Sequence, residues 1–148
     1  MVRHRTTGQG SLGHNHAGKY YSYEQAAMTA GPVQGRIPLI VAANAPRALD
    51  VVAAQTDGWT TFPGTAPEDE FRAASVKRIE RLERSGRPLR RILLAYSAIT
   101  PWSSVDGFRA MVADYAAIGF DEIGCHAPKP EERAVFDQVV PTLADYRD

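Results

Sequence analysis

The sequence has 148 residues, of which 44% are hydrophobic and 23% are charged, the balance of an ordinary soluble globular chain and not of a disordered or membrane-embedded one. Lysine plus arginine number 17 and so do aspartate plus glutamate, so no net charge attracts nucleic acid or an anionic membrane. The single cysteine excludes an internal disulfide, and no apolar run is long enough to span a bilayer. We therefore expect a single core in a reducing, cytoplasmic environment, with no nucleic-acid or membrane partner.

The first 36 residues differ in composition from the rest of the chain. They hold 6 of the 12 glycines and 3 of the 4 histidines, with almost no periodic apolar pattern. Turn-forming residues surround one aromatic cluster, formed by Tyr20, Tyr21 and Tyr23. His14 and His16 lack a third ligand at a suitable spacing, so we predict no metal site. We expect this segment, residues 1–36, to be an irregular extended arm.

From Ile37 onward, short apolar runs alternate with stretches of helical period, in four strand–helix pairs. The run "IPLIVAA", from Ile37 to Ala43, is typical of a parallel strand covered on both faces. A helix is predicted from Pro46, because proline suits a first helical turn. Its core-facing residues are Leu49, Val52 and Ala53. The second strand is predicted over "DGWTTF", residues 57–62.

The second helix carries its own start and stop signals. Thr65 and Glu68 have the spacing of a capping box, and "SGRP" at residues 85–88 ends the helix with glycine and proline. Its predicted core residues are Phe71, Ala74, Ile79 and Leu82. The arginine-rich run in its second half is interleaved with glutamates, which favours a solvated, ion-paired face over a nucleic-acid site.

The last two pairs follow the same pattern. The third strand is predicted over "RILLAYSAI", residues 91–99, and the third helix begins at Ser103 or Ser104 and ends at Gly119. The fourth strand is predicted over "DEIGCHA", residues 121–127, and a helix follows "PKPEE". Their predicted core residues are Val105, Phe108, Met111, Val112 and Tyr115 in the third helix, and Phe136, Val139, Val140 and Leu143 in the fourth.

Strands and helices that alternate through short connections specify a parallel sheet with right-handed crossovers. Both an open doubly wound sheet and a closed barrel use this unit, and four pairs make half of an eight-stranded barrel. We therefore predict an α/β fold: an irregular arm over residues 1–36, then a (βα)4 unit over residues 37–148 that corresponds to half of a TIM-type (β/α)8 barrel.

Several segments, in order, resemble the later half of luciferase-like monooxygenases. They are "GKYYSY", "PVQGRIP", "PLIVAANAPRALDVVAAQTDGW" and "YAAIGFDEIGCHAPKP". The resemblance implies a (β/α)8 barrel that binds FMN or the deazaflavin F420 and supports oxygenation of, or hydride transfer with, a small-molecule substrate. It implies that this chain is the C-terminal half of that barrel.

The turn "ANAPR", residues 43–47, is the main candidate site. It connects the end of a strand to the start of a helix. Free backbone N–H groups and the positive end of the helix dipole can attract phosphate there, and Arg47 can add a charged contact. The resemblance implies that Ala43, Asn44, Ala45 and Arg47 bind the cofactor phosphate. A plain helix start in a core is the alternative.

Two further residues are candidate substrate contacts. Trp102 can stack on a ring more readily than Trp59, although rim packing is the alternative for both. His126 follows the fourth strand and can donate to a substrate or transfer a proton, with an ordinary loop histidine as the alternative. Cys125 is predicted to be a buried strand thiol without an adjacent base. We identify no catalytic residue.

Two classes of function follow. The first is a flavin- or F420-dependent oxidoreductase or monooxygenase, in which this chain supplies the cofactor-phosphate half of the barrel. The second is a non-catalytic, truncated half-barrel that binds phosphate or flavin or serves as a partner subunit. In both, one sheet face lacks its opposite wall, lined either by Leu39, Val41, Leu93 and Ala95 or by their alternating neighbours. We therefore expect a homodimer or a complex with a complementing half-barrel chain.

Overall fold

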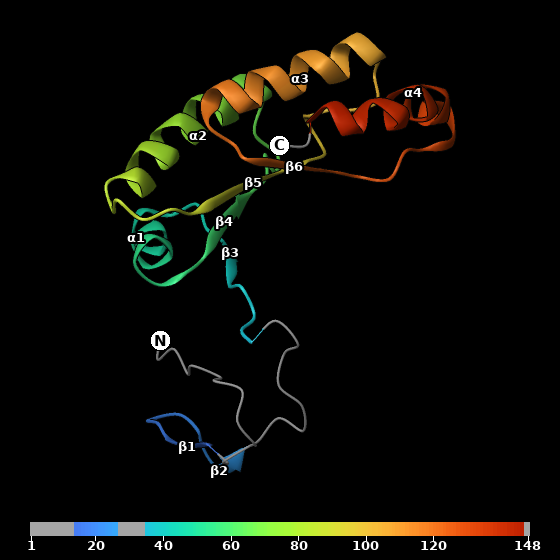
Figure 1. Ribbon diagram of the computed structural model, residues 1–148. Coiled ribbons are helices and arrows are strands. Elements are labelled where there is room, and N and C mark those ends of the chain that lie inside the picture. Colours follow the sequence, from blue (N-terminus) through green and yellow to red (C-terminus); the bar gives the residue numbers. More distant parts are fainter. Residues whose placement is uncertain (1–13, 27–34, 147–148) are drawn as a thin grey trace. The chain divides into compact units, whose positions relative to one another are not determined.

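The computed structural model describes residues 14–26 and 35–146, in one unit that ends at Pro38 and a second that begins at Leu39 (Figure 1). The described part of the first unit contains an antiparallel hairpin, β1 (His14–Ala17) and β2 (Ser22–Ala26). In this hairpin the His16 ring stacks on Tyr23, with 5.4 Å between centroids. The predicted irregular arm therefore contains regular structure, which the polar and glycine-rich composition did not indicate; its residues 1–13 and 27–34 lie outside the described residues.

The second unit is a four-stranded parallel sheet with helices between its strands. The strands are β3 (Ile40–Ala42), β4 (Gly58–Thr61), β5 (Arg90–Ala95) and β6 (Glu122–Cys125), and they lie side by side in chain order. The helices are α1 (Pro46–Gln55), α2 (Glu68–Glu83), α3 (Val105–Ile118) and α4 (Arg133–Val139), with 3-10 helices η1 (Pro130–Glu132) and η2 (Val140–Tyr146) flanking α4. Right-handed crossovers between consecutive neighbours place α1, α2 and α3 on one face of the sheet, and α4 packs beside α3 (Figure 1). The predicted (βα)4 order is confirmed.

Two boundaries differ from the sequence prediction. The strand predicted over Ile37–Ala43 has only three residues, because Pro38 cannot donate to a ladder and β3 is an edge strand with one neighbour. The Thr65–Glu68 capping box is wrong: α2 begins at Glu68 without a side-chain cap, because residues 63–66 form a turn in which Ala66 N donates to Pro63 O. By contrast, the third helix begins after one of the two serines predicted for its start: Ser104 caps α3 by accepting from Gly107 N.

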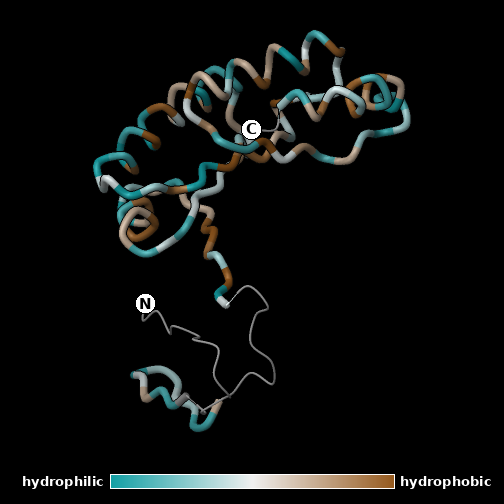
Figure 2. The backbone as a smooth tube through the Cα atoms, in the orientation of Figure 1, coloured by the Kyte–Doolittle hydropathy of each residue, from teal (hydrophilic) through white to brown (hydrophobic). Residues whose placement is uncertain are grey.

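The core lies between the sheet and the helices. Apolar residues recur at intervals along the helices (Figure 2), and most of the predicted core positions are buried. The buried ones are Leu49, Val52, Ala53, Phe71, Ile79, Leu82, Phe108, Met111, Tyr115 and Val139. Val140 and Leu143 were predicted to face the core and are instead exposed, because the chain continues beyond Val139 as a 3-10 helix, whose period differs from that of an α-helix.

Within the described residues of the second unit, the opposite face of the sheet carries no helix. The register aligns Thr61 with Leu93 and Leu93 with Ile123 on the helix-covered face, where Val41 and Ala95 also pack against the core. The residues that alternate with them line the open face: Ile40, Ala42, Thr60, Ile92 and Leu94. Gly58 and Gly124 lie between these side chains, and the Arg90–Glu122 ion pair lies at one end of the face. Of the two sets considered from the sequence, the structure places the alternating neighbours on this open face.

Aspartates fix the register at the amino ends of the strands. Asp57 precedes β4, and its Oδ2 accepts from Leu39 N at 2.8 Å while its own N donates to Leu39 O at 2.9 Å. Asp121 makes the same pair of bonds to Arg91 across β6 and β5. Each aspartate therefore joins its strand to the neighbouring one by both side chain and backbone.

Replacing Asp57 with alanine is expected to lower the free energy of unfolding by about 1–3 kcal/mol, because the N–H of Leu39 loses its acceptor. Asp57→Asn retains a carbonyl oxygen and should lose less. Urea denaturation of both variants is the measurement, and equal stability of Asp57→Ala and the parent would contradict this role.

Candidate cofactor-binding edge of the sheet

The carboxyl ends of the four strands meet at one edge of the sheet, where barrel enzymes build their sites. The segments after the strands are residues 43–45, 62–67, 96–104 and 126–129. All the site residues predicted from the sequence belong to this edge or to the helix start beside it. They fall into two groups, one after β3 and one spanning the loops after β5 and β6.

In the turn after β3, two backbone N–H groups find no acceptor among residues 14–26 and 35–146. Ala45 is the residue before α1, and Leu49 N donates to Ala45 O at 3.0 Å, so the N–H groups of Arg47 and Ala48 lie in the first turn, before the helical ladder begins. Pro46 has no N–H. Within the described residues, α1 has neither a side-chain cap nor an acid in its first turn, and Arg47 is exposed without a hydrogen-bond or ion-pair partner. In contrast, α2 begins with three acidic residues and α3 has a serine cap.

Two buried side chains of β4 hold this turn from beneath. Trp59, which is fully buried, donates from Nε1 to Ala43 O at 2.7 Å. Thr61, which is 1% exposed, donates from Oγ1 to Asn44 Oδ1 at 2.9 Å. The backbone at Ala43 and the side chain of Asn44 are therefore both fixed by the neighbouring strand.

Trp102 and His126 lie together in the second group. The Trp102 indole donates from Nε1 to His126 O at 2.8 Å, so it holds the loop after β6 as Trp59 holds the turn after β3. Its ring is 5% exposed and stacks nearly parallel on Phe108, with the edge of Phe136 against it. His126 is half-buried, with Nδ1 2.8 Å from Ala127 O. Their roles in binding a substrate stay predictions.

An aromatic pair at the same edge was missed by the sequence analysis. Phe62 and Tyr96 directly follow β4 and β5, and their rings stack with 5.2 Å between centroids. Ser97 Oγ donates to Gly64 O at 2.8 Å and ties the two loops together, with Ser97 itself in the left-handed region at a φ of 62°. An aromatic residue one place beyond each of two adjacent strands was the signal that could have found this pair.

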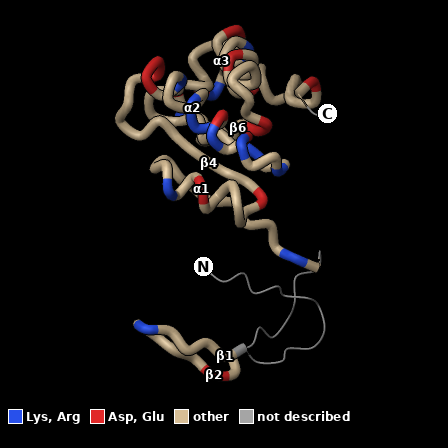
Figure 3. The backbone as a smooth tube through the Cα atoms, turned by 90° about the vertical axis from the view of Figure 1, so that its left-hand side faces the viewer, with Lys and Arg blue, Asp and Glu red and all other residues tan. Residues whose placement is uncertain are grey.

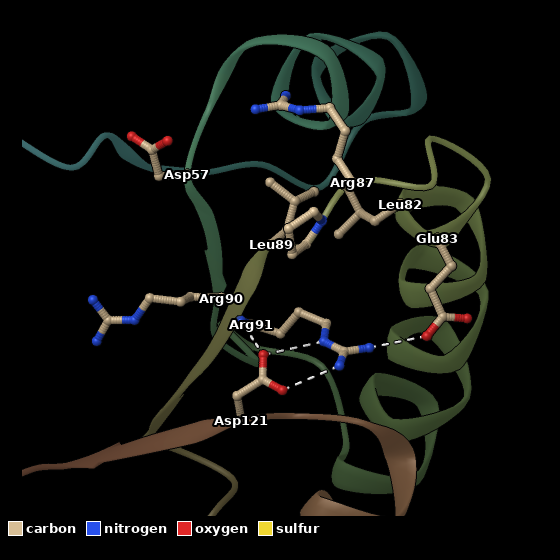
Figure 4. Close-up of a pocket in the computed structure, with 9 residues that line it drawn as sticks. Asp57, Leu82, Glu83, Arg87, Leu89, Arg90, Arg91 and Asp121 are labelled. Atoms are coloured by element: carbon tan, nitrogen blue, oxygen red, sulfur yellow. Dashed lines mark hydrogen bonds and ion pairs between the residues drawn. The ribbon is translucent and has the colours of Figure 1, made fainter.

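A hollow of about 440 Å³ lies at the opposite, amino-terminal edge (Figure 4). Its cations already have partners: Arg91 donates to Asp121 and Glu83, and Arg87 donates to Ala53 O and Thr56 O at the end of α1. The Asp121 carboxylate raises the pKa of Arg91. The amino-terminal edge of a barrel contributes to stability and not to catalysis. We therefore interpret the charged residues that line the hollow as a stabilising ion-pair network.

The arginine-rich run is ion-paired only in part: Arg91 pairs with the interleaved Glu83, and the other acidic partners come from outside α2. Arg81 pairs with Asp50 of α1, and Arg90 pairs with Glu122 of β6. Basic and acidic residues are interspersed over the second unit (Figure 3). This mixture disfavours a nucleic-acid surface.

Cys125 is half-buried at the end of β6, where burial raises the pKa of its thiol to about 11. Because the thiolate is the reactive form, iodoacetamide at pH 8 should alkylate the folded chain at least about 50-fold more slowly than the urea-unfolded chain. The rate in the folded chain should rise as the pH approaches 11. Equal rates in the folded and unfolded chains would contradict a protected thiol.

The comparisons with known proteins agree with this architecture. The model of the luciferase-like monooxygenase family matches residues 4–122. A solved structure, described as an F420-dependent secondary alcohol dehydrogenase in complex with an F420-acetone adduct, superposes with a TM-score of 0.64 at 12% sequence identity. The match covers 97% of this chain and 58% of that chain, so this chain spans little more than half of that enzyme. No curated protein sequence matches. The four parallel strands and their helices thus correspond to part of a luciferase-like barrel, and the chain belongs to the luciferase-like monooxygenase family.

Proposed function

We propose that this chain is the C-terminal half of a flavin- or F420-dependent oxidoreductase or monooxygenase barrel, and that its turn over residues 43–47 binds the cofactor phosphate. The observation that carries the proposal is the start of α1. There, the positive end of a helix dipole coincides with two backbone N–H groups and an Arg47 side chain that have no hydrogen-bond or ion-pair partner among the described residues.

The residues of the turn fit a phosphate group. Asn44 and Arg47 are exposed polar side chains, Ala45 is small enough for close approach, and no carboxylate lies in the first turn to repel an anion. Bound FMN or F420 would supply the redox chemistry of the family. The protein's own contribution at this edge is to bind and orient the cofactor tail, with the Phe62–Tyr96 pair as an apolar wall beside it. Trp102 and His126 would border the small-molecule substrate.

A second candidate function is binding without turnover. The chain spans 58% of the related enzyme, and the open sheet face leaves Ile92 and Leu94 only half-buried. A half-barrel of this kind would bind the cofactor or a partner chain while lacking the other wall of an active site. Turnover of a substrate by the purified chain with bound cofactor distinguishes the two candidates.

The open face also supports an assembly proposal. Closing an eight-stranded barrel would pair the free edges of β3 and β6 and cover the open face, which a second copy or a complementing half-barrel chain could do. No helix in the described parts of the chain is long and apolar enough to cross a bilayer. A cytoplasmic location stays a prediction.

Replacing Arg47 with alanine is expected to weaken binding of FMN or F420 by about 1–3 kcal/mol, because a charged hydrogen bond to the phosphate is lost. Binding of riboflavin, which has no phosphate, should not change. Fluorescence titration measures both. Arg109→Ala, which removes an exposed arginine from α3, is the matched control. Equal cofactor affinity in Arg47→Ala and the parent would exclude Arg47 from the site.

A further inference from the structure

We propose that Thr61 is a positioning residue that turns the amide nitrogen of Asn44 toward the cofactor phosphate. This inference rests on the proposed function of the turn. It adds a residue that lies on another strand and is too deeply buried to contact a ligand through its own side chain.

The geometry at Thr61 fixes the direction of one hydrogen bond. Thr61 ends β4, faces the helix-covered side in register with Leu93, and is 1% exposed. Its Oγ1 donates to Asn44 Oδ1 at 2.9 Å, across a separation of 17 residues in sequence. If the amide were reversed, the Thr61 hydroxyl would accept from the NH2 group, and its own buried proton would have no acceptor among the described residues. The amide oxygen of Asn44 is therefore held toward the sheet.

The consequence for Asn44 is electrostatic. A side-chain amide is planar, so holding its oxygen toward Thr61 directs its NH2 group, with two donors, away from that oxygen. Asn44 is exposed, and no acceptor for this NH2 group lies within the described residues. The reversed amide would present an oxygen to the ligand and repel an anion. Thr61 thereby selects the orientation in which Asn44 attracts phosphate.

The adjacent backbone is fixed in the same way. Trp59, two residues earlier on β4, donates to Ala43 O at 2.7 Å. The backbone before Asn44 and the side chain of Asn44 are thus both held before a ligand arrives. Such preorganisation lowers the entropic cost of binding, so a buried residue that never touches the ligand can still contribute to its affinity.

The test compares cofactors that carry phosphate with one that does not. Dissociation constants for FMN, F420 and riboflavin are measured by fluorescence titration in the parent and in Thr61→Val, which keeps the shape of the side chain and removes the hydroxyl. We expect about 3- to 10-fold weaker binding of the phosphate-bearing cofactor, as for the loss of one neutral hydrogen bond, with riboflavin unchanged. Thr61→Ser restores the hydroxyl and should bind within about twofold of the parent.

The chain offers a matched control one residue away. Thr60 Oγ1 is buried and has no hydrogen-bond partner among the described residues, so Thr60→Val makes the same chemical change without removing a bond. It should leave the ratio of FMN to riboflavin affinity as in the parent. In an Asn44→Ala background, Thr61→Val should have no further effect, because the two residues act through one bond.

Two results with Thr61→Val would overturn the inference. If folded Thr61→Val keeps the parent's preference for the phosphate-bearing cofactor, or loses FMN and riboflavin affinity equally, Thr61 does not orient the site. Thr61→Val retaining the preference while Arg47→Ala loses it would overturn this inference and leave the proposed function standing. A parent that binds neither FMN nor F420 more tightly than riboflavin would overturn both.

Discussion

Replacing Trp59 with alanine is expected to lower the free energy of unfolding by about 3–5 kcal/mol, the range for deleting a buried aromatic side chain. Trp59 is fully buried, its ring stacks on Phe120, and its Nε1 donates to Ala43 O. The same residue therefore packs the core and supports the candidate phosphate turn. Urea denaturation followed by circular dichroism measures the loss.

Trp59→Phe separates these two roles. It keeps a large apolar ring and removes the indole donor, so it should destabilise less than Trp59→Ala while still weakening FMN binding relative to riboflavin. If Trp59→Phe is as stable as the parent and binds FMN equally well, the hydrogen bond to Ala43 contributes nothing to the turn.

A charge on the open sheet face is expected to break the assembly of the chain. Leu94 lies on this face beside Gly124, where an added Cβ would come within 3.1 Å of Leu94 Cδ2. If a second half-barrel covers the face, Leu94→Asp buries an unpaired carboxylate. The association should then weaken by at least about 100-fold, equivalent to roughly 3 kcal/mol.

Analytical ultracentrifugation over a concentration series measures this effect. The parent chain expressed alone is expected to be a dimer, or else a partly molten and aggregation-prone monomer. Val76→Asp is the control, because Val76 is an exposed apolar residue on α2, and it should leave the oligomeric state unchanged. A monodisperse parent monomer whose β3 and β5 amides are strongly protected from hydrogen exchange would contradict the assembly proposal.

Local pattern was enough to predict the order of the elements and most of the core. The stripe of Leu49, Val52 and Ala53 needs only helical period, and Ser104 and Gly119 mark their helix ends by local chemistry. The errors arose where local signals compete. Thr65 has the spacing of a capping box but lies in a turn. Ile37 belongs to an apolar run that predicts a strand, but Pro38 follows it and the strand begins only at Ile40.

The support beneath the candidate site could not be predicted in this way. The bonds from Trp59 to Ala43 and from Thr61 to Asn44 span 16 and 17 residues and depend on the parallel register of β3 and β4. The sequence pointed to the turn itself through its position between strand and helix. It did not distinguish the two faces of the sheet, which the pairing of Leu93 with Thr61 and Ile123 decides.

The central claim is that the start of α1 receives the phosphate of the cofactor. Backbone amide NMR during addition of FMN tests it most directly, with riboflavin as the matched ligand without phosphate. The claim predicts saturable downfield shifts of the Arg47 and Ala48 amide protons with FMN and none with riboflavin. The reason is that both N–H groups lie in the first helical turn and have no acceptor in the part of the chain that the structure describes. Unchanged Arg47 and Ala48 amides at saturating FMN, or equal shifts with riboflavin, would contradict it.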